Sequence, residues 1–332
     1  RAVLLVTIPL AGYLGVLDMK HLYVVAFLGG ILTVFFDIAH MSLLPSLVAR
    51  DRLVEGNSKL EVSRSIAMIA GPGIAGILIQ LFTAAVALIF DAVSFLASAL
   101  FLLLIRTPES PAAHAATPQR FWAEVAEGLR TVWSQPLLRA MALSLCTFNF
   151  FYNLIGAVYV LYVVRDLGIV PAMLGLVYTI GSVGFALGAA LAGRAARRFG
   201  VGPAIVWGVC LSDAAFLLIP LASRQDQLMV PLLIAAQLLA TFAGPITAIN
   251  QLSLRQAITP DRLLDRVNAT MRTIALGAAP AGALLAGLLG GALGLRATLA
   301  IGACGIQLGF VILLLSPLRT LREPQQLHEA TT

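Results

Sequence analysis

Four ionisable side chains stand inside long apolar runs of the sequence. Asp37 and His40 are three residues apart in the segment FFDIAH, a spacing that places both on one face of a helix. Such a pair can hold or exchange a proton near neutral pH. Asp91 and Asp213 each stand alone in a further apolar run. A charge is costly in such surroundings, so all four are candidates for proton coupling. The alternative is a polar contact between helices, which we favour for Asp91 and Asp213.

Polar side chains among aromatic ones form a second candidate set. Asn149, Tyr152 and Asn153 stand amid three phenylalanines, and the two asparagines share a helix face at four-residue spacing. Donors of this kind suit a large amphipathic ligand in a central cavity, and ordinary packing with polar contacts is an equal alternative. Weaker candidates for the same cavity are Gln237, Asn250 and Gln251.

Several kinds of chemistry have no motif in the sequence. It carries no nucleotide-binding loop and no nucleophile, histidine and acid set, which disfavours an ATP-driven pump and an enzyme. Cys146, Cys210 and Cys304 show no metal-ligand spacing. We therefore expect no catalytic residues, no metal and no cofactor.

The composition indicates a protein that lies in lipid. Of its 332 residues, 59% are hydrophobic and 11% are charged, and the mean hydropathy is +0.93. Soluble domains carry about 25% charged residues. The net charge of +6 is spread over loops rather than gathered on one face, which argues against a nucleic-acid partner. The lipid bilayer is the expected partner.

The fold class expected is all-α, because helices satisfy their own backbone polar groups in lipid. A span needs about 20 apolar residues. We place ten spans, at about 2–17, 22–44, 64–82, 84–105, 137–163, 171–193, 203–221, 229–252, 269–292 and 296–316.

Basic residues alternate between the two ends of these spans. Of the 22 Lys and Arg residues, four (Lys20, Arg165, Arg224 and Arg296) fall on one side and 18 on the other. The positive-inside rule then predicts that the richer side, with both chain ends, is cytoplasmic. No Lys or Arg falls deep in a span, which argues against uptake of organic anions or phosphate.

The segment 106–136 is the one long loop. Its last part has Phe121, Val125, Leu129 and Val132 on one face at helical spacing, which predicts an amphipathic helix along the cytoplasmic interface. We interpret it as a linker between two halves. The domains expected are therefore a first bundle at 1–105, the linker at 106–136, a second bundle at 137–318 and a tail at 319–332.

A repeat supports two homologous halves. Asp51 and Arg52 match Asp261 and Arg262 in equivalent loops, where the two aspartates are expected to cap a helix or to pair with a nearby Arg. Six spans follow the linker and four precede it. We therefore expect a twelve-span protein whose first two spans precede Arg1.

Three stretches carry a family resemblance. The segment 188–200 looks like a loop signature, with Gly188, Arg194, Arg197, Arg198 and Gly200 in place and Gly193 where an acid often stands. The segment GPGIAG, with Gly71, Pro72 and Gly76, looks like the core of an antiporter motif, and Leu44–Ser65 looks like an exporter loop. In these stretches the chain resembles the major facilitator superfamily, and within it bacterial exporters related to the enterobactin, multidrug and macrolide effluxers.

This resemblance implies a fold of two pseudo-symmetric helix bundles in a bacterial plasma membrane. It implies a monomeric secondary transporter that exports hydrophobic or amphipathic small molecules (a drug, macrolide or siderophore) in exchange for protons, by alternating access. The basic loop residues would latch the cytoplasmic face. The alternatives are an importer of a neutral solute such as a sugar or peptide, and a transport-inactive truncated membrane protein.

Overall fold

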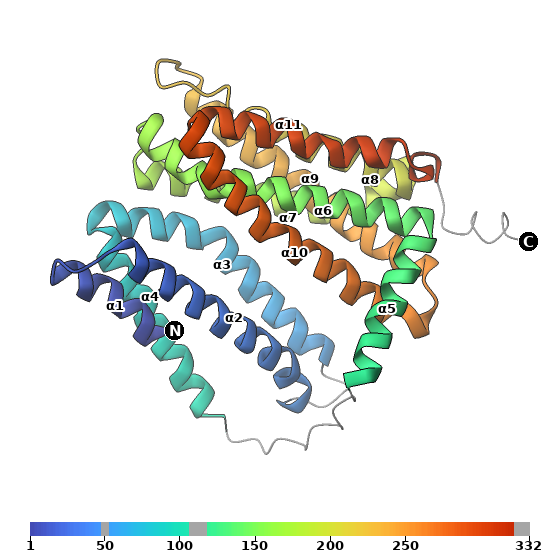
Figure 1. The fold of residues 1–332 in the computed structure, drawn as a ribbon, viewed down its shortest axis with the longest axis horizontal. Helices are drawn as coiled ribbons and strands as arrows, with labels where there is room; N and C mark the ends of the chain where they lie inside the picture. Colours follow the sequence, from blue (N-terminus) through green and yellow to red (C-terminus); the bar gives the residue numbers. More distant parts are fainter. Residues whose placement is uncertain (48–52, 106–117, 322–332) are drawn as a thin grey trace, which may run out of the picture. The chain divides into compact units, whose positions relative to one another are not determined.

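The computed structural model describes residues 1–47, 53–105 and 118–321, and all regular structure in these ranges is helical. This confirms the all-α prediction. The helices before the linker are α1 (Ala2–Tyr13), α2 (Met19–Leu47), α3 (Leu53–Leu81) and α4 (Ala84–Leu103), and the linker helix is α5 (Pro118–Ser134). The later helices are α6 (Pro136–Leu161), α7 (Pro171–Phe199), α8 (Val201–Phe216), α9 (Met229–Ile258), α10 (Asp261–Leu293) and α11 (Leu295–Leu314). A π-helical turn, η2 (Tyr162–Asp166), extends α6, and a 3₁₀ turn, η3 (Pro317–Thr320), follows α11 (Figure 1).

Each predicted span coincides with a helix of the described residues. Seven are long and apolar enough to cross a bilayer: α2, α4, α6 with η2, α7, α9, α10 and α11. Three shorter apolar helices fill the remaining positions, at α1, Ile66–Leu81 of α3, and α8.

Two helices, α1 and α8, end at least about four residues before the end of the predicted span. The first helix stops at Tyr13 rather than residue 17, and Gly15 then takes a φ of +69°, which glycine adopts without strain. The helix α8 stops at Phe216 rather than residue 221. Beyond it the backbone tightens into i→i+3 hydrogen bonds, such as Leu217 N to Ala214 O at 3.1 Å, ahead of Pro220. Apolar residues thus continue past both helix ends as turns.

The chain divides into two compact units, which are described separately. Unit 1 comprises residues 1–115 with 170–176, and unit 2 comprises residues 116–169 with 177–332. Among the described residues up to 105, only three apolar side chains are buried: Ala11, Val25 and Ala92. The continuous core lies in unit 2, where α5, α6, α8, α9, α10, α11 and η3 all contribute buried side chains.

Glycines bring the helices of unit 2 into close contact. A Cβ on Gly188 of α7 would overlap the carbonyl oxygen of Phe242 on α9, and one on Gly184 would lie 2.5 Å from Leu238 O. On α10, Gly282 meets the backbone of α6 at Phe150 in the same way. Gly287, in contrast, has open space around it. Small residues therefore set the helix spacing at specific contacts, as is usual in membranes.

The linker helix α5 packs on α10, at a steep angle to α6 (Figure 1). Gly128 lies against Arg266 O of α10, Val132 is fully buried, and Glu127 forms ion pairs with Arg266 and, at 3.5 Å, with Arg262. The predicted apolar face is only partly buried, because Val125 and Leu129 remain exposed. The contact of α5 with α10 is therefore made at the small residue Gly128 rather than along the whole predicted apolar face.

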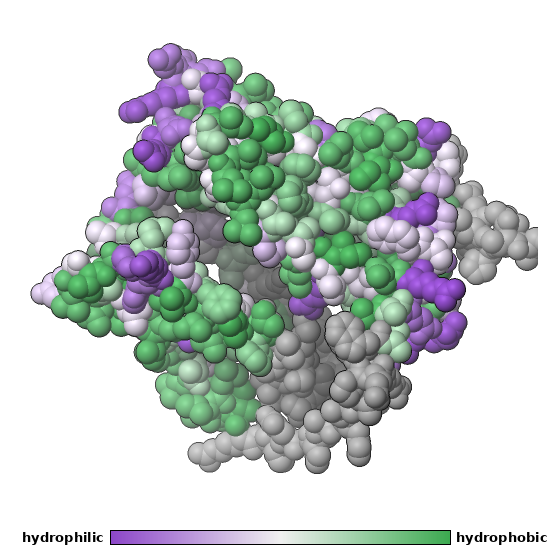
Figure 2. All heavy atoms as spheres, viewed as in Figure 1, coloured by the Kyte–Doolittle hydropathy of each residue, from purple (hydrophilic) through white to green (hydrophobic). Residues whose placement is uncertain are grey.

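The outer surface of the helices is apolar. Figure 2 shows hydrophobic residues along the helices of the visible face and hydrophilic ones gathered near helix ends. Leu284 and Leu288 of α10, for example, are each 73% exposed. A surface of this kind is stable only against lipid or another apolar partner, as the composition predicts.

Candidate functional site

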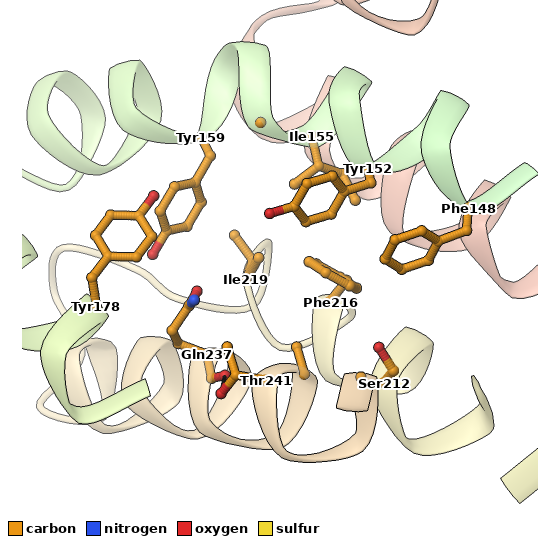
Figure 3. Close-up of a pocket in the computed structure, with 13 residues that line it drawn as sticks. Phe148, Tyr152, Ile155, Tyr159, Tyr178, Ser212, Phe216, Ile219, Gln237 and Thr241 are labelled. Atoms are coloured by element: carbon orange, nitrogen blue, oxygen red, sulfur yellow. Dashed lines mark hydrogen bonds between the residues drawn. The ribbon is translucent and has the colours of Figure 1, made fainter. Parts of the chain in front are cut away.

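A cavity of about 290 Å³ lies among four helices of unit 2. Figure 3 shows side chains from α6, α7, α8 and α9 converging on it, with Tyr159 and Tyr178 at one end and Phe148 and Ser212 at the other. Its lining residues are Phe148, Tyr152, Ile155, Gly156, Tyr159, Tyr178, Ser212, Phe216, Ile219, Gln237, Ala240, Thr241 and Gly244.

Aromatic rings make up much of its wall. The rings of Phe148 and Tyr152 stack with centroids 5.3 Å apart, and Tyr152 meets Phe216 edge-on at 5.9 Å. At the other end Tyr159 and Tyr178 meet edge-on at 6.1 Å. These contacts lock the rings against one another, so that the cavity offers preformed flat apolar surfaces.

A smaller cavity of about 150 Å³ adjoins the first. The two share Phe148, Ser212 and Gly244 in their linings. The smaller one is also lined by Asp213, which is only 1% exposed. Neither carboxylate oxygen of Asp213 has a hydrogen-bond partner among the described residues. The combined space therefore has an aromatic region and one unpaired acid.

Three of the six predicted cavity residues line these spaces. Tyr152 and Gln237 line the larger cavity and Gln251 the smaller. The other three do not belong to either lining. Asn149 and Asn153 donate their side-chain amides to carbonyl oxygens one turn earlier on α6, at 2.9 and 2.8 Å.

The amide of Asn250 joins two helices. It is buried and donates to Ala192 O of α7 at 3.2 Å as well as to Ile246 O of its own helix at 2.7 Å. The side chain of Asn250 therefore has a packing role in this structure. It fixes α9 to α7 behind the cavity.

The four predicted proton-coupling residues have different settings. Asp213 lines the smaller cavity, whereas Asp91 of α4 is exposed and belongs to unit 1. Asp37 and His40 lie within α2, but their side chains are outside the described residues.

The predicted loop and motif residues lie at helix ends and contacts. Gly188 is at the α7–α9 contact, Arg198 lies over the ring of Phe199 at 5.6 Å, and Gly200 precedes α8 with a φ of +93°. Gly193, Arg194 and Arg197 lie in the last turns of α7, and Arg262 in the first turn of α10. Gly71, Pro72 and Gly76 lie within α3. Asp51 and Arg52 fall outside the described residues, as does the side chain of Asp261.

Sequence reasoning missed Tyr159, Tyr178 and Phe216 of the aromatic wall. Part of the signal was present on α6, where Phe148, Tyr152 and Tyr159 recur at helical spacing and so share one face. The contributions of α7 and α8 depend on how those helices pack, which spacing within one helix does not reveal.

The geometry fits binding rather than covalent chemistry. A largely aromatic space with a few polar groups suits a small amphipathic molecule, held by its apolar surface and oriented by Gln237, Ser212 and Thr241.

Comparison with known proteins gives the family. The sequence matches the MFS_3 family, described as transmembrane secretion effector, over residues 2–331. The chain belongs to this family. The match confirms the resemblance to major facilitator exporters.

Two curated relatives of this chain are multidrug efflux pumps named Tap. The pump of Mycolicibacterium fortuitum is 29% identical over 329 residues, which are 95% of this chain and 77% of that pump. The pump of Mycobacterium tuberculosis strain H37Rv is 30% identical over 330 residues, which are 93% of this chain and 74% of that pump.

A solved structure supports the fold of this chain. It is described as a bacterial metal transporter, and it matches with a TM-score of 0.68 and 16% identity over 94% of this chain and 82% of that one. At this identity the likeness concerns the fold alone, and together with the family match it confirms the predicted major facilitator fold.

Proposed function

We propose that this chain exports hydrophobic or amphipathic small molecules, with unit 2 supplying a substrate cavity and a proton gradient supplying the energy. Membership of the secretion effector family and the two multidrug pumps among its relatives support export. The observation that carries the substrate class is the aromatic cavity of about 290 Å³ between α6, α7, α8 and α9.

The second part of the proposal is that export is coupled to the movement of protons. A buried acid with no partner is costly inside a membrane and marks a pathway for protons or substrate. Asp213 is such an acid among the described residues. Alternating access would then exchange a proton for the exported molecule across the membrane. We also propose a bacterial plasma-membrane location, both chain ends in the cytoplasm and a monomeric state.

The test uses everted membrane vesicles that contain the full gene product. Respiration acidifies the vesicle lumen, so an exporter accumulates the probe inside. We expect gradient-dependent accumulation of ethidium or Nile red, abolished by nigericin and unaffected by vanadate. No such accumulation of either dye would contradict export, and accumulation only in right-side-out vesicles would indicate an importer.

The cavity itself is tested by Tyr152→Ala. This change removes the ring that touches both Phe148 and Phe216. We expect the KM for the dye to rise by about tenfold, the equivalent of ~1.4 kcal/mol. The matched control is Trp207→Ala, an exposed aromatic side chain on α8 that is not in either lining, and its KM should stay within about twofold of the wild type. Equal effects of both variants on the KM would contradict the proposal that the dye binds in this cavity.

A further inference from the structure

We infer that a groove between the linker helix α5 and the first part of α10 binds a membrane phospholipid with a primary ammonium headgroup, as in phosphatidylethanolamine. The groove has a volume of about 400 Å³ and lies wholly within unit 2. Its lining shares no residue with the two cavities described above, so the inference goes beyond the proposed export function. The lining residues are Glu124, Val125, Leu129, Asp265, Arg266, Ala269, Thr270, Thr273 and Ile274.

The polarity of the groove changes along its length. Its α10 side extends from Asp265 to Ile274, nine residues later, which is about 14 Å along the helix axis. The charged side chains lie at the end nearer the start of α10. Further along, Thr270 and Thr273 donate their hydroxyls to carbonyl oxygens one turn earlier, at 2.8 and 2.9 Å, so their polar groups are already satisfied. A site that is charged at one end and apolar at the other matches a lipid headgroup followed by its acyl chains.

The linker helix supplies apolar surface that its own contacts leave uncovered. Val125 and Leu129 of α5 are 43% and 47% exposed, although both lie on its predicted apolar face. An amphipathic helix at a membrane interface buries such a face at the boundary of headgroups and acyl chains. The positive-inside rule places α5 and the start of α10 at the cytoplasmic interface, where phospholipid is the most abundant apolar partner. An acyl chain in the groove would cover both side chains.

The charges in the groove select the headgroup. Arg266 is the one basic residue of the lining, and it is already paired with Glu124, at 3.4 Å, and with Glu127. Asp265 is exposed and has no ion-pair partner among the described residues. An anionic headgroup would therefore meet an unpaired carboxylate, whereas an ammonium group would pair with it. A primary ammonium also donates three N–H hydrogen bonds, which the quaternary amine of phosphatidylcholine lacks.

The experiment uses native mass spectrometry of the purified full gene product to measure the Kd of single lipids. The probes are phosphatidylethanolamine, phosphatidylcholine and phosphatidylglycerol with identical acyl chains. Asp265→Asn removes the unpaired charge and keeps the size of the side chain. The matched control is Asp226→Asn, the same change at an exposed loop residue outside the groove. Ala269→Leu, at an exposed position of the lining, fills the groove without changing its charge.

We expect the wild type to bind phosphatidylethanolamine about fivefold more tightly than the other two lipids. Asp265→Asn should remove this preference by raising the Kd for phosphatidylethanolamine alone, and Asp226→Asn should keep it. Ala269→Leu should weaken the binding of phosphatidylethanolamine by about fivefold or more, because the acyl chain loses its place.

Three results would overturn the lipid site, and none of them bears on export. The first is equal Kd values of the three lipids for the wild type, which would leave the groove without headgroup selectivity. The second is an unchanged preference for phosphatidylethanolamine in Asp265→Asn. The third is tight binding of phosphatidylethanolamine by Ala269→Leu, which would place the lipid elsewhere and leave the groove to another part of the protein or to a second copy.

Discussion

At the scale of single residues, the same side-chain type has different roles within one turn of α9. Asn250 bonds to a carbonyl oxygen of α7, and Gln251 beside it lines the cavity near Asp213. On α6, Asn149 is satisfied by its own helix while Tyr152 faces the cavity. The sequence predicted all of these residues as cavity candidates. It could not distinguish the residues that line the cavity from those that bond to a backbone carbonyl, because the packing of neighbouring helices decides where each side chain points.

This difference is testable with two neighbouring variants. Asn250→Leu removes the hydrogen bond between α9 and α7 and should lower the free energy of unfolding by about 1 kcal/mol, with dye binding unchanged. Gln251→Leu should instead change dye affinity by about threefold or more and leave stability nearly unaltered. Thermal unfolding and dye titration of the purified protein measure both effects. The reverse pattern would show that Asn250 is the ligand-binding residue.

At the scale of elements, hydropathy determines where the helices lie in the sequence. Small residues determine where the helices pack closely against one another. Every predicted span coincides with a helix in the described ranges, because lipid forces backbone polar groups to pair within the segment. The ends of α1 and α8 were mispredicted, since turns at Gly15 and before Pro220 depend on local backbone preference rather than on hydropathy. Glycines are frequent in the apolar helices, but only some of them lie at helix contacts.

Two glycines therefore respond differently to the same substitution. Gly188→Ala places a methyl group against Phe242 O and should destabilise the protein by about 1–3 kcal/mol. Gly287→Ala has open space and should be neutral or stabilising by up to about 1 kcal/mol, since alanine is the better helix former. Melting temperatures in detergent compare the two. Equal melting temperatures would mean that α7 and α9 do not touch at Gly188 in the solubilised protein.

At the scale of the whole molecule, the positive-inside rule predicts which loops lie on the cytoplasmic side of the membrane. Side-chain contacts within each unit do not give this orientation. The linker helix α5 and the turn around Gln225 should lie on opposite sides of the membrane. Ion pairs of α5 with Arg262 and Arg266, both on the basic side, agree with a cytoplasmic linker.

Cysteine labelling tests this topology. With Cys146, Cys210 and Cys304 replaced by alanine, Gln225→Cys should react with a membrane-impermeant maleimide in intact cells. Ser134→Cys, at the exposed end of α5, should react only after permeabilisation. Labelling of Ser134→Cys in intact cells would place the linker outside and reverse the predicted orientation.

The position of the cavity within one unit limits where the energy of transport comes from. All residues in the two linings belong to unit 2. A molecule held only by these residues keeps the same contacts whichever way a rigid unit faces. A ligand with equal affinity for two states shifts neither population, however tightly it binds. Substrate bound there would not change the equilibrium between the inward-facing and outward-facing states. That equilibrium would have to be shifted by the proton, or by contacts that the substrate makes in only one of the two states.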